Sequence, residues 1–372
     1  MKSNYKRLGD YIRQVDIRNK DRRINRLLGV SISKTFIESI ANTVGTDFSN
    51  YKVVKKGQFA YGPVTSRNGD KISVAILREP ECIISSSYSV FEVCSDELLP
   101  DYLMLWFMRP EFDRYARYMS HGSVREIYDW DEMCSVELPV PGIMEQKRII
   151  NAYKTIEDRI ELKRKINDNL EAQTQAFFDS LFITDAEPDC TLADIALVNP
   201  TRALAKNTEA KCFDMSTLPT KGCIPEGEII KPYNGGARFI NGDTLIARIT
   251  PCLENGKAAY VNVLDDGEVA FGSTEFIVFA SKDNIPSSFY YFLIRNSRFV
   301  TFALQFMNGS SGRQRVSGEE LASFPLKRPS AYDLQKFNSM GNKILNQMRD
   351  NVKEIHVLQE LQSSISATLS SR

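Results

Sequence analysis

The sequence feature that most constrains the fold is a long amphipathic pattern that occurs twice. From about Ile143 to Phe182, and again from about Asp333 to the C-terminus, apolar residues recur every three or four positions. The two stretches superpose at a constant offset of 188 residues, which pairs Ile160 with Met348 and Leu170 with Leu358. A pattern of this length predicts coiled-coil helices, and its repetition predicts an internally duplicated chain.

The expected contact positions of the two helices follow from this spacing. They are Ile149, Ile156, Ile160, Leu170 and Phe177 in the first helix, and Ile344, Met348, Ile355, Leu358 and Ile365 in the second. Polar residues interrupt both patterns, at Lys163 and Asn167 and at Asn351. Polar side chains in such a seam can fix helix register and partner choice at some cost in stability. We therefore expect a coiled-coil seam along each of the two helices.

The segments before the helices repeat as well, at offsets near 186. Residues 55–61 match residues 240–246 around Gly57 and Gly242, and residues 84–91 match residues 271–278. Short runs rich in β-branched and aromatic residues predict strands, which we place at 57–61, 72–77, 88–93, 244–249, 258–263 and 275–280. A helix-like aromatic run follows in each copy, over 102–118 and 289–306.

These patterns predict a mixed α/β (α+β) protein with a pseudo-twofold internal repeat. We expect a first globular domain at 1–142, a central helix at 143–183, a second globular domain at 184–332 and a C-terminal helix at 333–372. Proline-containing stretches at 138–142 and 324–329 precede the two helices and are typical of such boundaries.

Composition narrows the class of protein. The seven cysteines are scattered and form no Cys-x-x-Cys pair, which favours reduced thiols in a cytoplasmic protein and argues against a zinc site. No apolar run reaches the roughly 18 residues that a membrane span needs, and the first ten residues do not predict export. The net charge is zero, although nucleic-acid-binding proteins usually carry a basic surplus. Local basic stretches exist nonetheless, with ten Lys or Arg against three Asp from Lys2 to Lys34.

Motifs for catalysis are not found. The two histidines, His121 and His356, lie in different contexts and have no companions for general-base or metal chemistry. The Gly256-Lys257 pair lacks the upstream glycine of a phosphate-binding loop. We therefore predict a chain with no catalytic residues, no metal and no cofactor of its own.

What remains is recognition of DNA by short polar loops. His121-Gly-Ser-Val-Arg125 and Asn308-Gly-Ser-Ser-Gly-Arg-Gln-Arg315 are rich in glycine, serine and arginine. Arginine suits guanine, asparagine and glutamine suit adenine, and serine suits either a base or a phosphate. An ordinary surface loop remains the alternative. The candidate DNA-binding residues are Arg67, Asn68, Lys71, His121, Ser123, Arg125, Arg248, Asn255, Lys257, Asn308, Ser310, Ser311, Arg313, Gln314 and Arg315.

One stretch carries a resemblance to a known family. Val136-Glu-Leu-Pro-Val-Pro-Gly-Ile-Met-Glu-Gln-Lys-Arg-Ile149 is similar to the Pro-x-Pro-x-x-x-x-Glu-Gln-x-x-Ile element of specificity subunits of type I restriction–modification systems. The counterpart, residues 324–337, keeps Pro and Gln but has Asp333-Leu334 where the family has Glu before Gln. The openings Arg7-Leu-Gly-Asp-Tyr-Ile12 and Thr191-Leu-Ala-Asp-Ile-Ala196 are also family-like. The order of these motifs resembles the family along the whole chain.

The resemblance implies a division of labour. Each globular domain would be a target-recognition domain for one half of a split DNA sequence. The two helices, roughly 60 Å long, would pack antiparallel, separate the two domains and serve as subunit interfaces. Two methyltransferase subunits carrying S-adenosylmethionine, and ATP-driven endonuclease subunits, are the implied partners. Two alternatives stay open, namely a specificity subunit of a related phage-defence or type II system and a coiled-coil scaffold without DNA readout.

Overall fold

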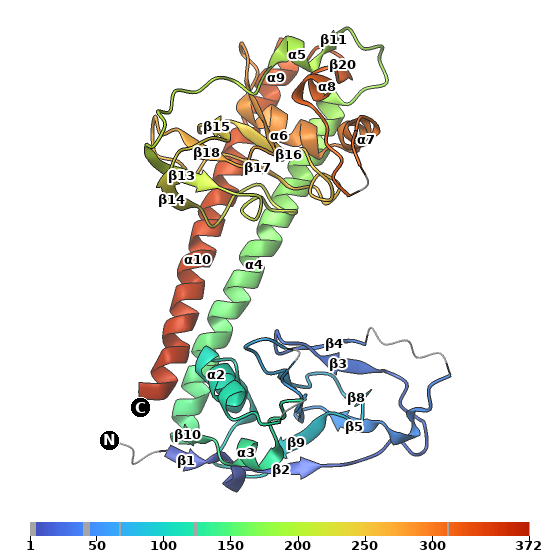
Figure 1. Cartoon of the computed structure of the whole chain (residues 1–372), viewed down its shortest axis with the longest axis vertical. Helices are drawn as coiled ribbons and strands as arrows, with labels where there is room; N and C mark the ends of the chain where they lie inside the picture. Colours follow the sequence, from blue (N-terminus) through green and yellow to red (C-terminus); the bar gives the residue numbers. More distant parts are fainter. Residues whose placement is uncertain (1–4, 40–44, 67, 123–124, 311, 372) are drawn as a thin grey trace. The chain divides into compact units, whose positions relative to one another are not determined.

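The computed structural model describes residues 5–39, 45–66, 68–122, 125–310 and 312–371. The predictions at Arg67, Ser123 and Ser311 therefore lie outside the described residues. The chain divides into two compact units (Figure 1). Unit 1 comprises Met1–Asp158 and Leu358–Arg372, and unit 2 comprises Arg159–Val357. Each unit combines a globular part with portions of the two long helices, α4 (Ile143–Phe182) and α10 (Gly341–Ser371).

Unit 1 is built on an antiparallel sheet with the strand order β2-β9-β6-β7. These strands are β2 (Ile12–Val15), β9 (Ser89–Val93), β6 (Phe59–Tyr61) and β7 (Val74–Ile76), so the strands expected at 57–61, 72–77 and 88–93 are confirmed. Three strand pairs surround the sheet: β1 (Tyr5–Arg7) with β10 (Glu137–Pro139), β3 (Leu28–Val30) with β4 (Phe36–Glu38), and β5 (Lys52–Lys55) with β8 (Glu81–Ile84).

The helices of unit 1 are α1 (Pro100–Phe107), α2 (Pro110–Tyr118) and α3 (Trp130–Cys134), with 3-10 turns at Leu8–Asp10 and Phe48–Asn50. Aromatic side chains join α1 to the sheet. Phe59 stacks on Phe91 with ring centroids 4.9 Å apart, and Phe107 meets both rings edge-on. Burial of such large apolar rings is the main favourable term in a core of this kind.

Unit 2 contains a sheet of the same order, β12-β19-β16-β17, which is also antiparallel throughout. Its strands are β12 (Ala196–Val198), β19 (Phe276–Ser281), β16 (Thr244–Ala247) and β17 (Ala258–Tyr260), so the three strands expected here are confirmed. A second sheet, β14-β13-β18-β15, consists of β14 (Ile229–Pro232), β13 (Glu209–Phe213), β18 (Ala270–Gly272) and β15 (Ala237–Phe239). In this sheet β13 and β18 are parallel. The pair β11 (Cys190–Thr191) and β20 (Pro325–Leu326) completes the strands.

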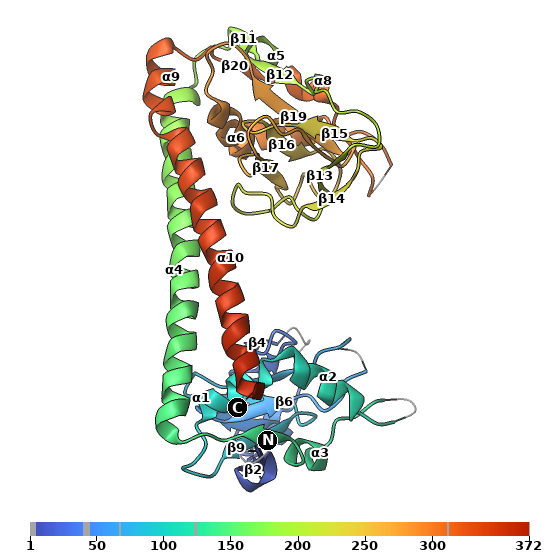
Figure 2. The ribbon, with the colours of Figure 1, turned by 90° about the vertical axis from the view of Figure 1, so that its left-hand side faces the viewer.

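The helices of unit 2 are α5 (Leu192–Ile195), α6 (Ser287–Arg295), α7 (Ser297–Gln305), α8 (Gly318–Ala322) and α9 (Ala331–Asn338). Helix α6 packs on β16, β17 and β19 (Figure 2). Its residues Phe289 to Ile294 are all nearly inaccessible to solvent, which places α6 inside the unit 2 core.

The sequence predicted one helix-like run over 102–118 and another over 289–306. In the structure each run is divided into two helices. Arg109 is extended (φ −73°, ψ 138°) between α1 and α2, because a residue before proline disfavours the helical conformation and Pro110 follows it. In unit 2 the interruption falls at Asn296, which is extended and caps α7 by accepting a hydrogen bond from the Arg298 N–H. Each run is therefore a helix–helix corner that turns the chain toward the following loop.

The predicted long C-terminal helix is present, but a short break near its start divides it into two. Helix α9 ends at Asn338 and α10 begins at Gly341. The ring of Phe337 is fully buried and lies so close to Gly341 that a Cβ there would be 2.8 Å from it. Because the break allows Phe337 to enter the core while the chain continues past it, tertiary packing overrides the helical pattern here.

By contrast, α4 begins at the predicted residue. Gln146 is fully buried and connects the start of the helix to unit 1. Its side-chain amide donates to the carbonyls of Glu97 and Pro141, at 2.7 and 2.8 Å, and its oxygen accepts from the Leu99 N–H at 2.8 Å. This satisfies main-chain groups at the helix entrance that would otherwise be buried without partners. The glutamine of the Glu-Gln motif therefore has a structural role.

Within unit 2, α4 and α10 lie side by side and run antiparallel (Figures 1 and 2). The three polar residues of the seam contact one another. The Asn351 amide donates to Asn167 Oδ1 at 2.7 Å, and Lys163 Nζ donates to Asn351 Oδ1 at 3.0 Å. Asn351 is buried, so its hydrogen bonds offset the cost of removing its amide from water. The polar breaks thus pair across the seam.

The contact positions expected from the sequence differ in how deeply they are buried. Ile156, Ile160, Met348 and Ile355 are buried, but Phe177 and Ile344 are only half-buried. Their neighbours Phe178 and Leu345 are fully buried instead. The remaining predicted contacts, Ile149, Leu170, Leu358 and Ile365, are half-buried. A helix of 3.6 residues per turn drifts against a fixed seam, and near its end α4 packs on the unit 2 core as well as on its partner helix.

Candidate nucleic-acid interface

The first loop, His121–Ile127, follows α2 and is closed by its own main chain. The N–H of His121 donates to the carbonyl of Ile127 at 3.1 Å, and the reverse bond measures 2.9 Å. Val64 also bridges to Ile127, and the Thr65 N–H donates to the Glu126 carbonyl at 3.0 Å. Gly122 has φ +136°, and a Cβ there would lie 2.1 Å from the Arg125 carbonyl oxygen. Only glycine fits, and the closure leaves His121 and Arg125 exposed.

The second loop, Asn308–Arg315, is held in the same way in unit 2. Asn308 and Arg315 exchange main-chain hydrogen bonds of 2.9 and 2.8 Å, and Ile249 bridges to Arg315. The Thr250 N–H donates to the Gln314 carbonyl at 3.0 Å. Gly309 has φ +128°, close to the φ of +136° at Gly122 in the first loop.

The two loops share a frame but differ in content. The second loop is one residue longer, and Gln314 and Arg315 occupy the places of Glu126 and Ile127 beside the closing bonds. Where Arg117 of α2 pairs with Glu126 in unit 1, the second loop is braced by Glu275. The predicted recognition segments are therefore structural counterparts with different side chains.

Arg315 is the best-held side chain of the second loop. Its Nε donates to both carboxylate oxygens of Glu275, at 3.0 and 2.9 Å, and Nη2 donates at 2.8 Å. These hydrogen bonds raise the pKa of Arg315 and lower the pKa of Glu275. The Nε and Nη2 groups of Arg315, which could otherwise make a bidentate contact with guanine, thus donate to Glu275.

Arg313 differs from Arg315. Its side chain is exposed, and among the described residues no hydrogen bond or ion pair holds it. Ser310 is exposed beside it and accepts the Arg313 N–H at 3.0 Å through its carbonyl. Asn308 donates its amide to Glu320 Oε1 at 3.1 Å, so it too is positioned by a neighbouring carboxylate.

The candidates on the inter-strand turns are placed less favourably. Lys257 donates to the Met215 carbonyl at 2.6 Å, and the half-buried Arg248 lies beside Glu275 and Glu320. Asn255 is exposed. Asn68 is half-buried and donates to the Val64 carbonyl at 3.4 Å, whereas Lys71 is exposed. Arg248, whose carbonyl accepts the Val316 N–H at 3.0 Å, thus belongs to the frame around the second loop.

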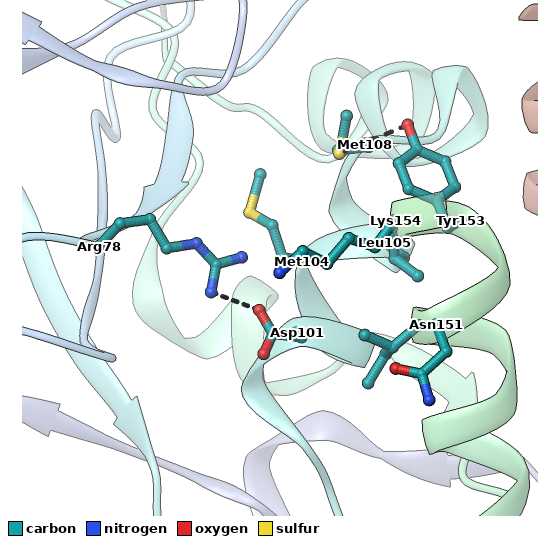
Figure 3. Close-up of a pocket in the computed structure, with 9 residues that line it drawn as sticks. Arg78, Asp101, Met104, Leu105, Met108, Asn151, Tyr153 and Lys154 are labelled. Carbon is teal, nitrogen blue, oxygen red and sulfur yellow. Dashed lines mark hydrogen bonds and ion pairs between the residues drawn. The ribbon is translucent and has the colours of Figure 1, made fainter. Parts of the chain in front are cut away.

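A separate groove in unit 1 lies between α1 and the first turns of α4 (Figure 3). It has a volume of about 460 Å³ and an Arg78–Asp101 ion pair at its edge. The Tyr153 hydroxyl points to Met108 Sδ at 4.0 Å. None of the predicted DNA-binding residues lines this groove, whose other members are Met104, Leu105, Ile150, Asn151 and Lys154.

The described residues offer neither a candidate metal centre nor a candidate membrane span. In the part of the chain that the structure describes, no three His, Cys, Asp or Glu side chains cluster in a way that could hold a metal ion. Over the same residues, no helix has the length and apolar character needed to cross a bilayer.

The architecture defines a class of protein in which two α/β units share two long helices. Each unit carries a polar loop that is held by an ion pair. Comparison with known proteins is consistent with this class. No protein-family model matches the chain. The HindI type I restriction enzyme specificity subunit of Haemophilus influenzae is 29% identical over 140 residues, which cover 37% of this chain and 30% of that protein. The MjaIX specificity subunit of Methanocaldococcus jannaschii is 21% identical over 297 residues, or 73% of this chain and 68% of that protein.

The fold comparison agrees with the sequence comparison. The S subunit of a type I restriction–modification system from M. genitalium superposes with a TM-score of 0.60 at 12% identity, covering 98% of this chain and 95% of that chain. The resemblance to type I specificity subunits is confirmed: the chain's curated relatives are such subunits, and it shares their fold. The segment matched in the HindI relative spans less than a third of that protein's length.

Proposed function

We propose that this chain is a DNA-specificity subunit of a type I restriction–modification complex, in which each globular domain reads one half of a split target. The observation that carries the proposal is the pair of loops, closed by equivalent main-chain hydrogen bonds but carrying different side chains. A common frame with two different readers is what an asymmetric bipartite sequence requires.

We propose further that the chain arose by internal duplication and that α4 and α10 form an antiparallel coiled coil. Three observations support this. The two central sheets have corresponding strand orders, the closing pairs His121–Ile127 and Asn308–Arg315 lie near one sequence offset, and the polar residues of the seam pair with each other. A helix of 40 residues measures roughly 60 Å, enough to set a spacing greater than one DNA turn of roughly 34 Å.

We assign different roles to the arginines of the loops, because Arg315 is ion-paired with Glu275 whereas Arg313 is exposed. In this proposal Arg313 and Arg125 are the primary base-reading arginines, because both are exposed at loop tips. Arg315 holds the second loop against Glu275 and contributes shape rather than direct readout. Arg248 is a frame residue of the same loop, and the Lys257 side chain is held by the Met215 carbonyl. The exposed His121, Asn255 and Ser310 remain candidate contacts, together with Asn308 and Gln314.

The proposed partners are those that the resemblance to type I specificity subunits implies. As a non-catalytic specificity subunit, the chain would bind two methyltransferase subunits, which carry S-adenosylmethionine, and ATP-driven endonuclease subunits. The domain boundaries at 142, 183 and 332 are part of this proposal, because each globular domain must be separable from the helices in order to be exchanged.

The test is methylation mapping of DNA exposed to the chain co-purified with its methyltransferase. We expect a bipartite methylated sequence, of which one half changes when residues 1–142 are exchanged for another recognition domain. Arg313→Ala should relax one half, and Arg125→Ala the other. Arg148→Ala is a matched control, because this arginine of α4 has a side chain 81% exposed and lies outside both loops. An unchanged methylation pattern after the domain exchange contradicts the proposal.

A further inference from the structure

A second pocket of unit 1 lies beside the first loop, at the C-terminal end of α2. Its volume is about 600 Å³, and it is wide open to solvent. The lining comes from α2 and from the turn before β7. The residues are Asp70, Lys71, Pro110, Asp113, Arg114, Arg117 and Tyr118, of which only Lys71 was expected from the sequence to contact DNA.

Tyr118 is the most unusual member of this set. Its side chain is 82% exposed, the largest exposed fraction among the large hydrophobic residues that the structure describes. It ends α2, three residues before His121. An aromatic ring held in water at the end of a helix gains nothing from the core, whereas its flat face and hydroxyl suit packing against a sugar and donation to a phosphate.

The acids around the pocket are largely neutralised. Asp113 forms a buried ion pair with Lys34 at 2.7 Å, and Glu126 pairs with Arg117. Arg114 makes only an exposed ion pair with Glu111 at 3.4 Å. Because exposed pairs of this kind are weak, the positive charge of Arg114 remains available to a ligand. Lys71 is exposed as well. Asp70 is the one lining acid for which the described residues show no cationic partner.

Among the described residues of unit 2, the helix before the second loop lacks the two arginines and the tyrosine of α2. Alignment of the two loops at His121 and Asn308 places Thr301, Leu304 and Gln305 of α7 where α2 has Arg114, Arg117 and Tyr118. Since the frames of the loops agree, this difference in the preceding helix is specific to unit 1.

We propose that the pocket binds the backbone of duplex DNA, with Lys71 and Arg114 on a phosphate and the Tyr118 ring along the adjoining deoxyribose. The inference rests on the proposed function, and it adds a sequence-independent contact that only the first half-site receives. Arg117 connects this contact to the first loop through Glu126, so that the backbone contact positions the loop over its bases. Phosphate contacts of this kind fix register without reading sequence.

The first test measures binding of the full chain to a random-sequence duplex of about 30 base pairs at several salt concentrations. Lys71→Ala with Arg114→Ala should reduce the steepness of log affinity against log salt by about 0.9, because the two cations together neutralise one phosphate. Arg148→Ala with Lys165→Ala, two exposed cations of α4, is the matched control and should leave the slope unchanged.

The aromatic contact is tested separately. Tyr118→Ala should weaken binding about tenfold on every sequence, while Tyr118→Phe, which keeps the ring, should lose less. Tyr332→Ala in α9 is the matched control, since this tyrosine is 67% exposed and far along the chain from either loop. Asp70→Asn provides a test of opposite sign, because removing the unpaired acid should strengthen binding.

An unchanged salt slope in the double variant, or unchanged or weaker binding by Asp70→Asn, overturns the proposal. So does a Tyr118→Ala chain that binds DNA normally but no longer binds its methyltransferase, which would make the pocket a protein interface. These results are distinct from failure of the proposed function, which would appear as a wild-type complex without a bipartite methylated sequence.

Discussion

Replacing Asp113 by asparagine removes the counter-charge of a buried lysine beneath the first loop. The side chains of Lys34 and Asp113 are 6% and 10% exposed, and Lys34 Nζ lies 2.7 Å from Asp113 Oδ1. Lys34 also donates to the Phe107 carbonyl, and Asp113 accepts the Ile72 N–H at 3.1 Å. Burial lowers the pKa of Lys34, which shows that its ammonium depends on this carboxylate for compensation.

The expected cost is large because one charge would remain buried without its partner. Breaking a buried ion pair from one side typically costs about 3–5 kcal/mol, and asparagine, which still offers an oxygen to Lys34, should fall near the lower end. A domain has a free energy of unfolding of about 5–15 kcal/mol, so the variant should fold but be markedly weakened. For a unit of this size the midpoint of thermal unfolding should fall by roughly 10 °C.

Thermal and urea unfolding of the full chain would measure this effect, with Glu161→Gln as a control that breaks the exposed Glu161–Lys165 pair of α4. Adding Lys34→Met to Asp113→Asn should recover much of the loss, because it removes the unpaired charge while the new amide can still accept the Ile72 N–H. A loss below about 1 kcal/mol in Asp113→Asn, or no recovery in the double variant, would refute the electrostatic reasoning.

Three further predictions concern the helices and the core. Asn351→Leu should lower the free energy of unfolding by about 1–3 kcal/mol, because it leaves Asn167 Oδ1 without its donor; adding Asn167→Leu should restore stability in urea titrations. Phe178→Ala should cost about 3–5 kcal/mol and Phe177→Ala clearly less, as thermal unfolding would show; equal losses would contradict the observed burial. Burial raises the pKa of Cys82 to about 12 from its ordinary 9.0, so its contribution to stability is full below pH 9 and lost as the pH rises toward 12. Unfolding midpoints measured across this range should fall less steeply for Cys82→Ala, and an identical pH profile would exclude the effect.

Much of the local structure could be predicted from the sequence because the signals are local. The 3.6-residue period and the Pro-x-Pro stretch placed α4 at its observed start, Ile143. The six expected strands are present because β-branched and aromatic runs between turn residues have few other stable conformations. The seam residues Lys163, Asn167 and Asn351 were recognisable as polar interruptions of an apolar pattern.

Other features depend on contacts between distant residues and were not readable from the pattern. The break before Gly341 exists because Phe337 enters the unit 2 core, and the burial of Phe178 rather than Phe177 reflects a helix that faces a globular core as well as its partner. The pattern of arginines in the second loop indicated two equivalent readers. Only the fold shows that Glu275, 40 residues earlier, holds Arg315 and leaves Arg313 exposed.

The same division applies to the pocket beside the first loop. The sequence by itself predicted the strands, the long helices and the polar loops, because periodicity and turn chemistry act over a few residues. Tertiary structure alone decided which charges are neutralised, since Lys34 reaches Asp113 across 79 positions of sequence. Electrostatic compensation is a property of distances in space, and those distances decide which cations of this protein remain available to a ligand.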